Sequence, residues 1–465
     1  MRFVLLVLAL FLLGCVVGSK DWSPQDTASQ AATHNYAFVN GRWFDGEEFY
    51  AATWYTTRGR LTHQRPEGPF ETVDLSGLFV VPPFGEAHNH NVEGTWNLQI
   101  VTARYLQDGV FYVKNPNNVR EFAQQIRSAV NVPTSIDAVF AHAGLTGSGG
   151  HPIALYEDVL RVSRYELAIG PLERGWFENR AYIVIETEAD VDEKWALITS
   201  GRPEFLKVFL AHSEDDGLGR RPGKARIGLH PHLLPHIVTK AHAAGLQVTA
   251  HVETGADFRQ AVQAGVDEIA HTPGWLVRNA EDLERAKLTK ADARLAAERG
   301  VRVVTTTVAA HAMPTVDAHH SGPHHEDHAP KHSAPAGPAL ADLSRQVLKD
   351  NLSLLHRAGV QLVIGSDHAD TSLAEALHLH SFGIFDNLTL LKMWCETTPA
   401  AIFPNRKLGR FEEGYEASFL ALAGNPLHDF TQVQTIRKRI KQGALLDERE
   451  GRGPGDSEDT HHGKS

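Results

Sequence analysis

The sequence has few residues of the kinds that mark several common protein classes. Only two of its 465 residues are cysteine, Cys15 and Cys395, which excludes a disulfide framework and a CxxC metal site. Basic residues are outnumbered by acidic ones, and the formal net charge of −11 argues against a nucleic-acid-binding protein. Charged residues make up 22% and hydrophobic residues 42% of the chain, so it is neither wholly disordered, collagen-like nor a coiled coil.

Long apolar runs are also scarce, and the most continuous one begins the chain. Residues 1–14 place Arg2 before a run that is shorter than the roughly 20 residues of a membrane-spanning helix. This pattern predicts a secretory signal peptide. The sequence Leu-Leu-Gly-Cys at 12–15 is similar to a bacterial lipobox, in which Cys15 is lipidated. Val16 then favours an outer-membrane anchor that faces the periplasm, with residues 15–33 as a tether. A plain signal peptide cut a few residues later is the alternative, and it would give a periplasmic or secreted protein.

Histidine, by contrast, is abundant, with 27 residues. Such an excess is most simply explained by metal chemistry. Residues 311–338 contain several of these histidines among prolines without a regular period, and we interpret them as a His-rich insertion. Residues 449–465 are polar and rich in glycine, and we expect a disordered tail.

The two ends of the remaining chain have the pattern of β-strands. Residues 34–77 contain Asn40-Gly41 and Asp45-Gly46, which are typical hairpin turns, between β-forming residues. Residues 401–448 return to this pattern, so we predict that both ends form one small β-sandwich.

Between these ends, residues 78–400 alternate apolar runs with helical stretches such as 233–244 and 281–299. Eight strands separated by helices predict an α/β fold, a (β/α)8 TIM-like barrel. The expected strands are 78–84, 110–113, 136–142, 205–212, 246–251, 266–271, 301–308 and 360–367.

Candidate metal ligands end several of these runs, where barrel enzymes place their chemistry. His88 and His90 are two residues apart, so in an extended chain both imidazoles point to one side. Alone this spacing is weak, since His-x-His recurs at 230/232 and 378/380. His251, His271 and Asp367 end three further runs. For any one of them alone, a buried structural side chain is as good an interpretation as a metal ligand. Their joint occurrence predicts a metal site.

Lys207 stands inside the apolar run 205–210. One interpretation is a lysine that extends to the rim of the barrel. The other is a lysine that burial keeps neutral and that CO2 converts to a carbamate, an anionic ligand able to bridge two metal ions.

This set of residues resembles the amidohydrolase superfamily, in its imidazolonepropionase-like and prolidase-like branch. The segments LKVFL, TAHVE and AHTPG have close counterparts there. The resemblance implies that His88, His90 and Asp367 hold one metal ion. It implies that His251 and His271 hold a second ion and that carboxylated Lys207 bridges the two. The ions would be Zn2+, with Mn2+ or Fe2+ as substitutes, and would supply a hydroxide nucleophile while Asp367 transfers the proton.

Loops after the strands would select the substrate. Tyr112 and His142 could assist a tetrahedral intermediate, although each fits a packing role as well. The Gly-rich loop 146–151 could offer backbone NH groups, or simply be flexible. Arg220, Arg221 and Lys224 could receive a carboxylate, or form a solvated surface.

The resulting hypothesis is a metal-dependent hydrolase of C–N bonds in a small molecule, for example a dipeptidase or cyclic amidase. An esterase or lactonase with the same site is one alternative. A metal-sequestering surface lipoprotein that uses the His-rich segment is another. The expected partners are a small-molecule substrate and, through the lipid anchor, a membrane; nucleic acid is not among them, and the chain could form a homo-oligomer.

Overall fold

The computed structural model describes residues 35–216, 228–309, 338–367 and 370–446. The predicted signal peptide with Cys15, the tether, all but the last residue of the His-rich insertion, the basic residues 220, 221 and 224, and the tail lie outside the described residues. Within those four ranges, no helix has both the length and the apolar character needed to cross a membrane.

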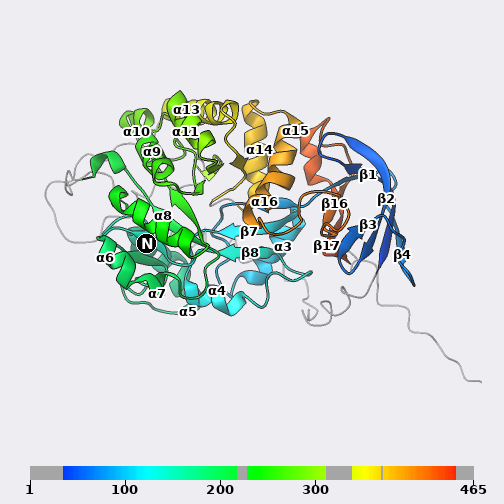
Figure 1. Ribbon diagram of the computed structural model, residues 1–465, viewed down its shortest axis with the longest axis horizontal. Coiled ribbons are helices and arrows are strands. Elements are labelled where there is room, and N and C mark those ends of the chain that lie inside the picture. Colours follow the sequence, from blue (N-terminus) through cyan, green and yellow to red (C-terminus); the bar gives the residue numbers. More distant parts are fainter. Residues whose placement is uncertain (1–34, 217–227, 310–337, 368–369, 447–465) are drawn as a thin grey trace, which may run out of the picture.

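A mixed sheet at one end of the molecule joins the two ends of the chain (Figure 1). In the part that the structure describes, its order is β18-β17-β16-β5-β1-β2-β3, and β4 pairs with β1. β1 runs antiparallel to β2 and parallel to β4 and β5, while β16 runs antiparallel to β5. The strands are β1 (Tyr36–Phe44), β2 (Phe49–Thr57), β3 (Arg60–Thr62), β4 (Glu71–Asp74), β5 (Phe79–Val81), β16 (Phe419–Leu422), β17 (Ile436–Lys441) and β18 (Ala444–Leu445).

Aromatic packing holds the two ends together. The rings of Phe38 and Trp43 in β1 lie 4.8 and 4.9 Å from the ring of Phe419 in β16. All three side chains are fully buried, and edge-to-face pairs of this kind add to the stabilisation from burial alone. The sequence prediction that both ends build one β unit agrees with this arrangement, but the strands form one hydrogen-bonded sheet rather than two separate ones.

The expected first barrel strand, 78–84, is wrong as a single element. It is divided between β5, which belongs to the mixed sheet, and β6 (Phe84–Glu86), which pairs with β7. Pro82 and Pro83 separate the two strands. Proline has no N–H to donate to a strand ladder, so this dipeptide ends one sheet and lets the chain enter the next.

Parallel strands make up the rest of the β structure. They form the sheets β6-β7-β8 and β10-β9-β11-β12-β13-β14-β15. Backbone hydrogen bonds connect the edges of these sheets, from Glu204 N to Phe140 O and from Ala87 N to Ile364 O. The strands are β7 (Val110–Asn115), β8 (Asp137–Phe140), β9 (Gly144–Thr146), β10 (Tyr182–Val184), β11 (Phe205–Phe209), β12 (Gln247–His251), β13 (Glu268–Ile269), β14 (Arg302–Val304) and β15 (Leu362–Val363).

Helices connect these strands, as expected for an α/β fold. The predicted helical stretch 281–299 is two helices, because Thr289 accepts a hydrogen bond from Asp292 N and so caps the start of a new helix. The main helices are α3 (Leu98–Gln107), α4 (Arg120–Ile126), α6 (Glu188–Glu193), α7 (Trp195–Ile198), α8 (Leu234–Ala243), α9 (Gly255–Ala264), α10 (Ala280–Arg285), α11 (Lys290–Glu298), α13 (Pro338–Arg357), α14 (Ser372–Phe382), α15 (Asn387–Lys392) and α16 (Thr398–Ile402).

The segment between β8 and β11 holds the elements that sequence reasoning missed. It contains the short strands β9 and β10 and, between them, a π-helix, η1 (Leu155–Tyr165), followed by α5 (Glu166–Ile169). Tyr156 and Tyr165 of η1 pack with Phe177 in an aromatic cluster that is separate from the main core.

Candidate metal centre

The predicted ligands lie at one edge of the parallel sheets. His88 and His90 follow β6, His271 follows β13 by two residues, and Asp367 follows β15. His251 is the last residue of β12. Because all these strands are parallel, their carboxyl ends meet at the same edge.

The structure brings the side chains of His88, His271 and Asp367 together. One ligand atom from each lies within 4.8 Å of the others, a spacing that a single metal ion can bridge. His88 Nε2 is 3.7 Å and His90 Nε2 is 3.4 Å from Asp367 Oδ1. The ring of His251 lies 4.6 Å from that of His271. The five strand-end side chains therefore form one continuous cluster.

A backbone hydrogen bond holds Asp367, which follows β15, against His88, which follows β6. Asp367 N donates to His88 O over 2.7 Å, and Asp367 has a left-handed φ of 56°. Gly365 makes the approach possible, because a Cβ there would lie 2.8 Å from His88 N and 2.6 Å from Val304 Cγ1. The positive φ of a non-glycine residue is a conformation that surrounding structure must enforce, and such strain is common at functional sites.

Three histidines of the cluster, His88, His251 and His271, are held neutral. Burial, together with the nearby Lys207 charge, keeps the pKa of His88 well below its ordinary value. Burial also lowers the pKa of His251 and, more strongly, of His271. A neutral imidazole keeps a lone pair for a metal ion, so these pKa shifts favour metal binding over proton binding.

Lys207 lies in β11 and is 1% exposed. Its Nζ has no hydrogen-bond partner among the described residues. Burial lowers the pKa of Lys207 to about 7, so much of the amine is neutral near neutral pH. The nearby Lys114 is different, because its Nζ donates to Glu268 Oε1 over 2.6 Å and forms a buried ion pair. Of these two buried lysines, Lys207 is therefore the one whose amine can react or bind a ligand.

Neighbouring side-chain and backbone groups orient two of the ligand rings. His271 Nδ1 is 3.0 Å from Thr306 Oγ1, and its ring stacks on Trp275 at 4.3 Å. His90 Nδ1 is 3.1 Å from Asn117 O. In each ring the contact occupies Nδ1 and leaves Nε2 to face the cluster, which is the usual way that a second layer of residues directs a metal-binding imidazole.

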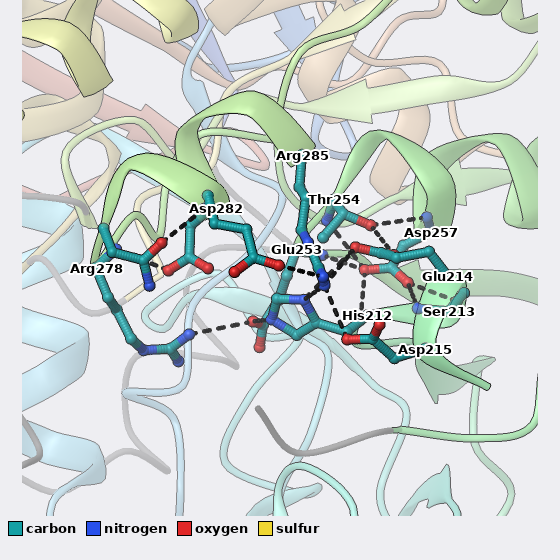
Figure 2. Close-up of polar contacts among 12 residues, drawn as sticks. His212, Ser213, Glu214, Asp215, Glu253, Thr254, Asp257, Arg278, Asp282 and Arg285 are labelled. Atoms are coloured by element: carbon teal, nitrogen blue, oxygen red, sulfur yellow. Dashed lines mark hydrogen bonds and ion pairs between the residues drawn. The ribbon is translucent and has the colours of Figure 1, made fainter. Parts of the chain in front are cut away.

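A charged network of residues that follow β11 and β12 lies beside His251 of the cluster. Figure 2 shows its polar contacts. Asp257 accepts hydrogen bonds from the backbone N–H groups of His212, Ser213 and Glu253. His212 Nε2 lies 3.2 Å from Glu253 Oε2, and the other oxygen of Glu253 is 3.7 Å from His251 Nε2. The network therefore connects directly to a candidate ligand.

His212 is charged in this network. Burial alone would lower its pKa, but Glu214 and Glu253 raise it to about 10 despite Arg285 Nη1, which lies 3.4 Å from His212 Nδ1. Although burial would raise the pKa of Glu253, the nearby imidazoles of His212 and His251 hold it well below its usual value. The sequence offered one signal, the histidine at the end of the run 205–212.

We expect His212→Gln to lower the free energy of unfolding by about 3 kcal/mol at pH 7, because it leaves the buried Glu253 carboxylate without its main cation. A raised folded pKa contributes stability that is complete below the unfolded value of about 6.5 and is lost as the pH rises through about 10. The difference from wild type should therefore shrink between pH 7 and pH 10 in urea unfolding experiments.

The matched control is His236→Gln, since His236 also pairs with an aspartate, Asp192, but at the exposed surface. It should change the free energy of unfolding by less than about 1 kcal/mol at either pH. An equal loss in both variants would contradict a buried charged pair at His212.

Tyr112 and His142 are not brought to the cluster. The Tyr112 hydroxyl donates to Glu416 Oε1 over 3.2 Å on the side of the mixed sheet. β7 extends to Asn115, so Tyr112 lies three residues before the strand end, roughly 10 Å down the strand. His142 has a left-handed φ of 60°, and its Nε2 lies 3.2 Å from Gly201 O. These contacts favour the packing alternative for both side chains over a role at a tetrahedral intermediate.

His151 is a site residue whose place the sequence did not predict. It ends the Gly-rich loop that follows β9, and its ring stacks on His251 at 4.6 Å. The ring also lies 5.2 Å from that of Phe209 in β11. A histidine that closes a glycine-rich loop after a strand was the available signal, and it carried too little information alone.

Comparison with known proteins agrees with this geometry. Residues 222–446 match the model of the Amidohydrolase family. None of the curated protein sequences matches the chain. The architecture is similar to that of a crystallised amidohydrolase, with a TM-score of 0.64 and 20% identity over 88% of this chain and 98% of that one.

Two further crystal structures have the same fold. A prolidase in complex with N-methylphosphonate-L-proline aligns with a TM-score of 0.63 and 18% identity over 88% of this chain and 99% of that one. The ochratoxinase of A. niger aligns with a TM-score of 0.64 and 16% identity over 89% of this chain and 95% of that one. Together with the family match, these likenesses support a hydrolase that acts on C–N bonds.

Proposed function

We propose that the protein is a metal-dependent hydrolase that cleaves an amide or peptide-like C–N bond in a small molecule. The observation that carries the proposal is the meeting of His88, His271 and Asp367 within 4.8 Å, beside a buried lysine without a hydrogen-bond partner in the described chain. The eight strands β6, β7, β8, β11, β12, β13, β14 and β15 would close into a (β/α)8 barrel around it.

The donor set would serve two divalent ions that lie close together. His88, His90 and Asp367 would hold one and His251 and His271 the other, with His271 within 4.8 Å of ligand atoms of the first. Nitrogen and carboxylate ligands suit Zn2+, with Mn2+ or Fe2+ as substitutes. When bound, such ions polarise a carbonyl group and lower the pKa of water to near 7.

Lys207 would bridge the ions as a carbamate. Its neutral amine attacks CO2 to form the N–C bond, and one proton leaves to solvent. A pKa of about 7 supports this step, because the protonated amine has no lone pair. The carbamate changes the charge from positive to negative, which relieves repulsion between two cations in a buried site.

Asp367 would move the proton. Its backbone is fixed by His88 and its carboxylate faces the cluster, 2% exposed. There it can accept a proton from the attacking water and deliver it to the leaving nitrogen, which otherwise departs as a poor leaving group. His151 stacks on His251 and would contact the substrate from there.

The substrate class is proposed from the neighbours. Similar structures include the prolidase above, an Xaa-Pro dipeptidase with bound methionine and a phenylurea hydrolase. We therefore propose dipeptides, N-acyl amino acids and aryl ureas as the first substrates to test with the zinc-loaded protein. Hydrolysis of at least one amide class, abolished by chelation and restored by zinc, is the expected result. Turnover of esters or lactones alone would instead support the esterase alternative.

We also propose that the protein is exported and anchored by lipid at Cys15. Cys15→Ser should then move the protein from the membrane fraction to soluble or unprocessed material, because the acyl chains attach to that thiol. Membrane fractionation and mass spectrometry of the mature N-terminus measure this. A wild-type protein that is soluble and begins beyond Cys15 would show that a plain signal peptide is used.

A further inference from the structure

A second group of metal-ligating side chains lies on residues that the proposed function does not use. Asp216 follows the short 3-10 helix η2 (Ser213–Asp215), and His230 and His232 belong to the turn of η3 (Pro231–Leu233). One ligand atom from each of the three lies within 4.8 Å of the others. We infer that Asp216, His230 and His232 form a separate binding site for Zn2+ or a similar divalent metal ion.

The distances fit such an ion. His230 Nδ1 lies 2.7 Å from Asp216 Oδ1, and the rings of His230 and His232 are 5.7 Å apart. Ligand atoms on one tetrahedral zinc lie roughly 3.4 Å from each other, given bonds of about 2.1 Å. Small side-chain rotations are therefore enough to bring the three ligands around one ion.

A second carboxylate can orient the His230 ring. Glu186, which follows β10, has its Oε2 3.6 Å from His230 Nε2, the ring nitrogen that does not face Asp216. Two imidazoles with one carboxylate make a donor set that selects Zn2+, Cu2+ or Ni2+ over Mg2+ and Ca2+, which prefer oxygen ligands alone. The side chains of Asp216 and His230 are 27% and 35% exposed, so water can complete the coordination. This predicts weaker binding than in the buried cluster.

An ion at this site would hold together loops that border the candidate metal centre. Ser148 N donates to Glu186, and Gly147 lies so close to Gly228 that a Cβ on it would come within 2.6 Å of Gly228 O. The same loop continues to His151, which stacks on His251 of the candidate metal centre. An ion on Asp216 and His230 would thus connect the segments that follow β9, β10 and β11 at the rim of that centre.

The test compares zinc binding by three full-length proteins. The variant is His230→Ala/His232→Ala, and the control is His236→Ala/His242→Ala, because His236 and His242 also face aspartates but belong to no ligand group found in the described residues. Each protein is equilibrated with buffered free zinc and its bound zinc is measured by atomic spectrometry. Wild type and control should bind one more equivalent than the variant, at a weaker affinity than the first ions.

Hydrogen–deuterium exchange gives a readout that does not depend on histidine number. Zinc should slow exchange at residues 147–151 and 228–233 in wild type and control but not in the variant, and Mg2+ should have no effect. Asp216→Asn keeps the size of the side chain and should weaken this zinc site about tenfold, since a charged ligand is lost. Equal zinc content in all three proteins, or unchanged affinity in Asp216→Asn, would overturn the site without affecting the proposed hydrolase.

Discussion

Replacing Asp367 by asparagine should lower kcat by about 10²–10⁴-fold, the usual contribution of a positioned general base and acid. The amide has the size of the carboxylate but cannot accept the proton of the attacking water. His88 and His90 remain, so we expect much of the metal to stay bound. Steady-state kinetics and metal analysis of the same preparations measure both effects.

Asp370→Asn is the matched control for this experiment. Asp370 lies three residues further along the chain, is 79% exposed and pairs with Arg104 rather than with the cluster. It should keep kcat within about twofold, as surface substitutions usually have small effects. If Asp367→Asn behaves like this control, Asp367 does not carry the proton, and the assigned mechanism is wrong.

Substituting Lys207 should have the second largest effect. Lys207→Ala removes the proposed bridging carbamate, so we expect loss of at least one metal ion and of most activity. Short carboxylates, added with excess metal, should partly restore turnover because they can occupy the position of the carbamate. Lys207→Arg should not be rescued, since a guanidinium stays charged and cannot react with CO2.

The two Lys207 variants separate a bridging role from a packing role. A lysine that only fills space would lose stability on truncation, but its activity would not respond to added carboxylate. A density map that shows a bare amine at Lys207, with one ion on His88, His90 and Asp367, would leave a mononuclear hydrolase. Thermal unfolding of Lys207→Ala checks that the variant remains folded.

The strand positions could be predicted because buried parallel strands are short apolar runs, and all the expected runs except 78–84 coincide with one strand of the parallel sheets. The ligands could be predicted because histidines and an aspartate end these runs. The excursion from β9 to β10 was not predicted, since a π-helix and three-residue strands leave little periodicity in the sequence. Tyr112 was misplaced because the run 110–113 ends two residues before the strand itself.

Contacts between distant residues could not be predicted either. Nothing local in the sequence shows that Lys114 pairs with Glu268 or that His212 is charged by Glu253. Such pairs depend on which strands become neighbours and on how deeply each side chain is buried. The pairing of Asp216 with His230 is of the same kind. The His-x-His spacing at 230/232 is weak evidence in the sequence and becomes a candidate site only because Asp216 lies beside it.

The contact between the first and last parallel strands also bears on when the proposed centre could acquire a metal ion. Ser366 donates to Glu86, 280 residues earlier in the chain, and Asp367 reaches His88 at the same place. A ribosome must therefore release almost the whole parallel-stranded region before His88 meets Asp367. Contacts of such sequence separation form slowly, and an ion that binds only the folded chain stabilises it from that moment. Any product that ends before Asp367 would lack one of the candidate ligands and could not form the proposed centre.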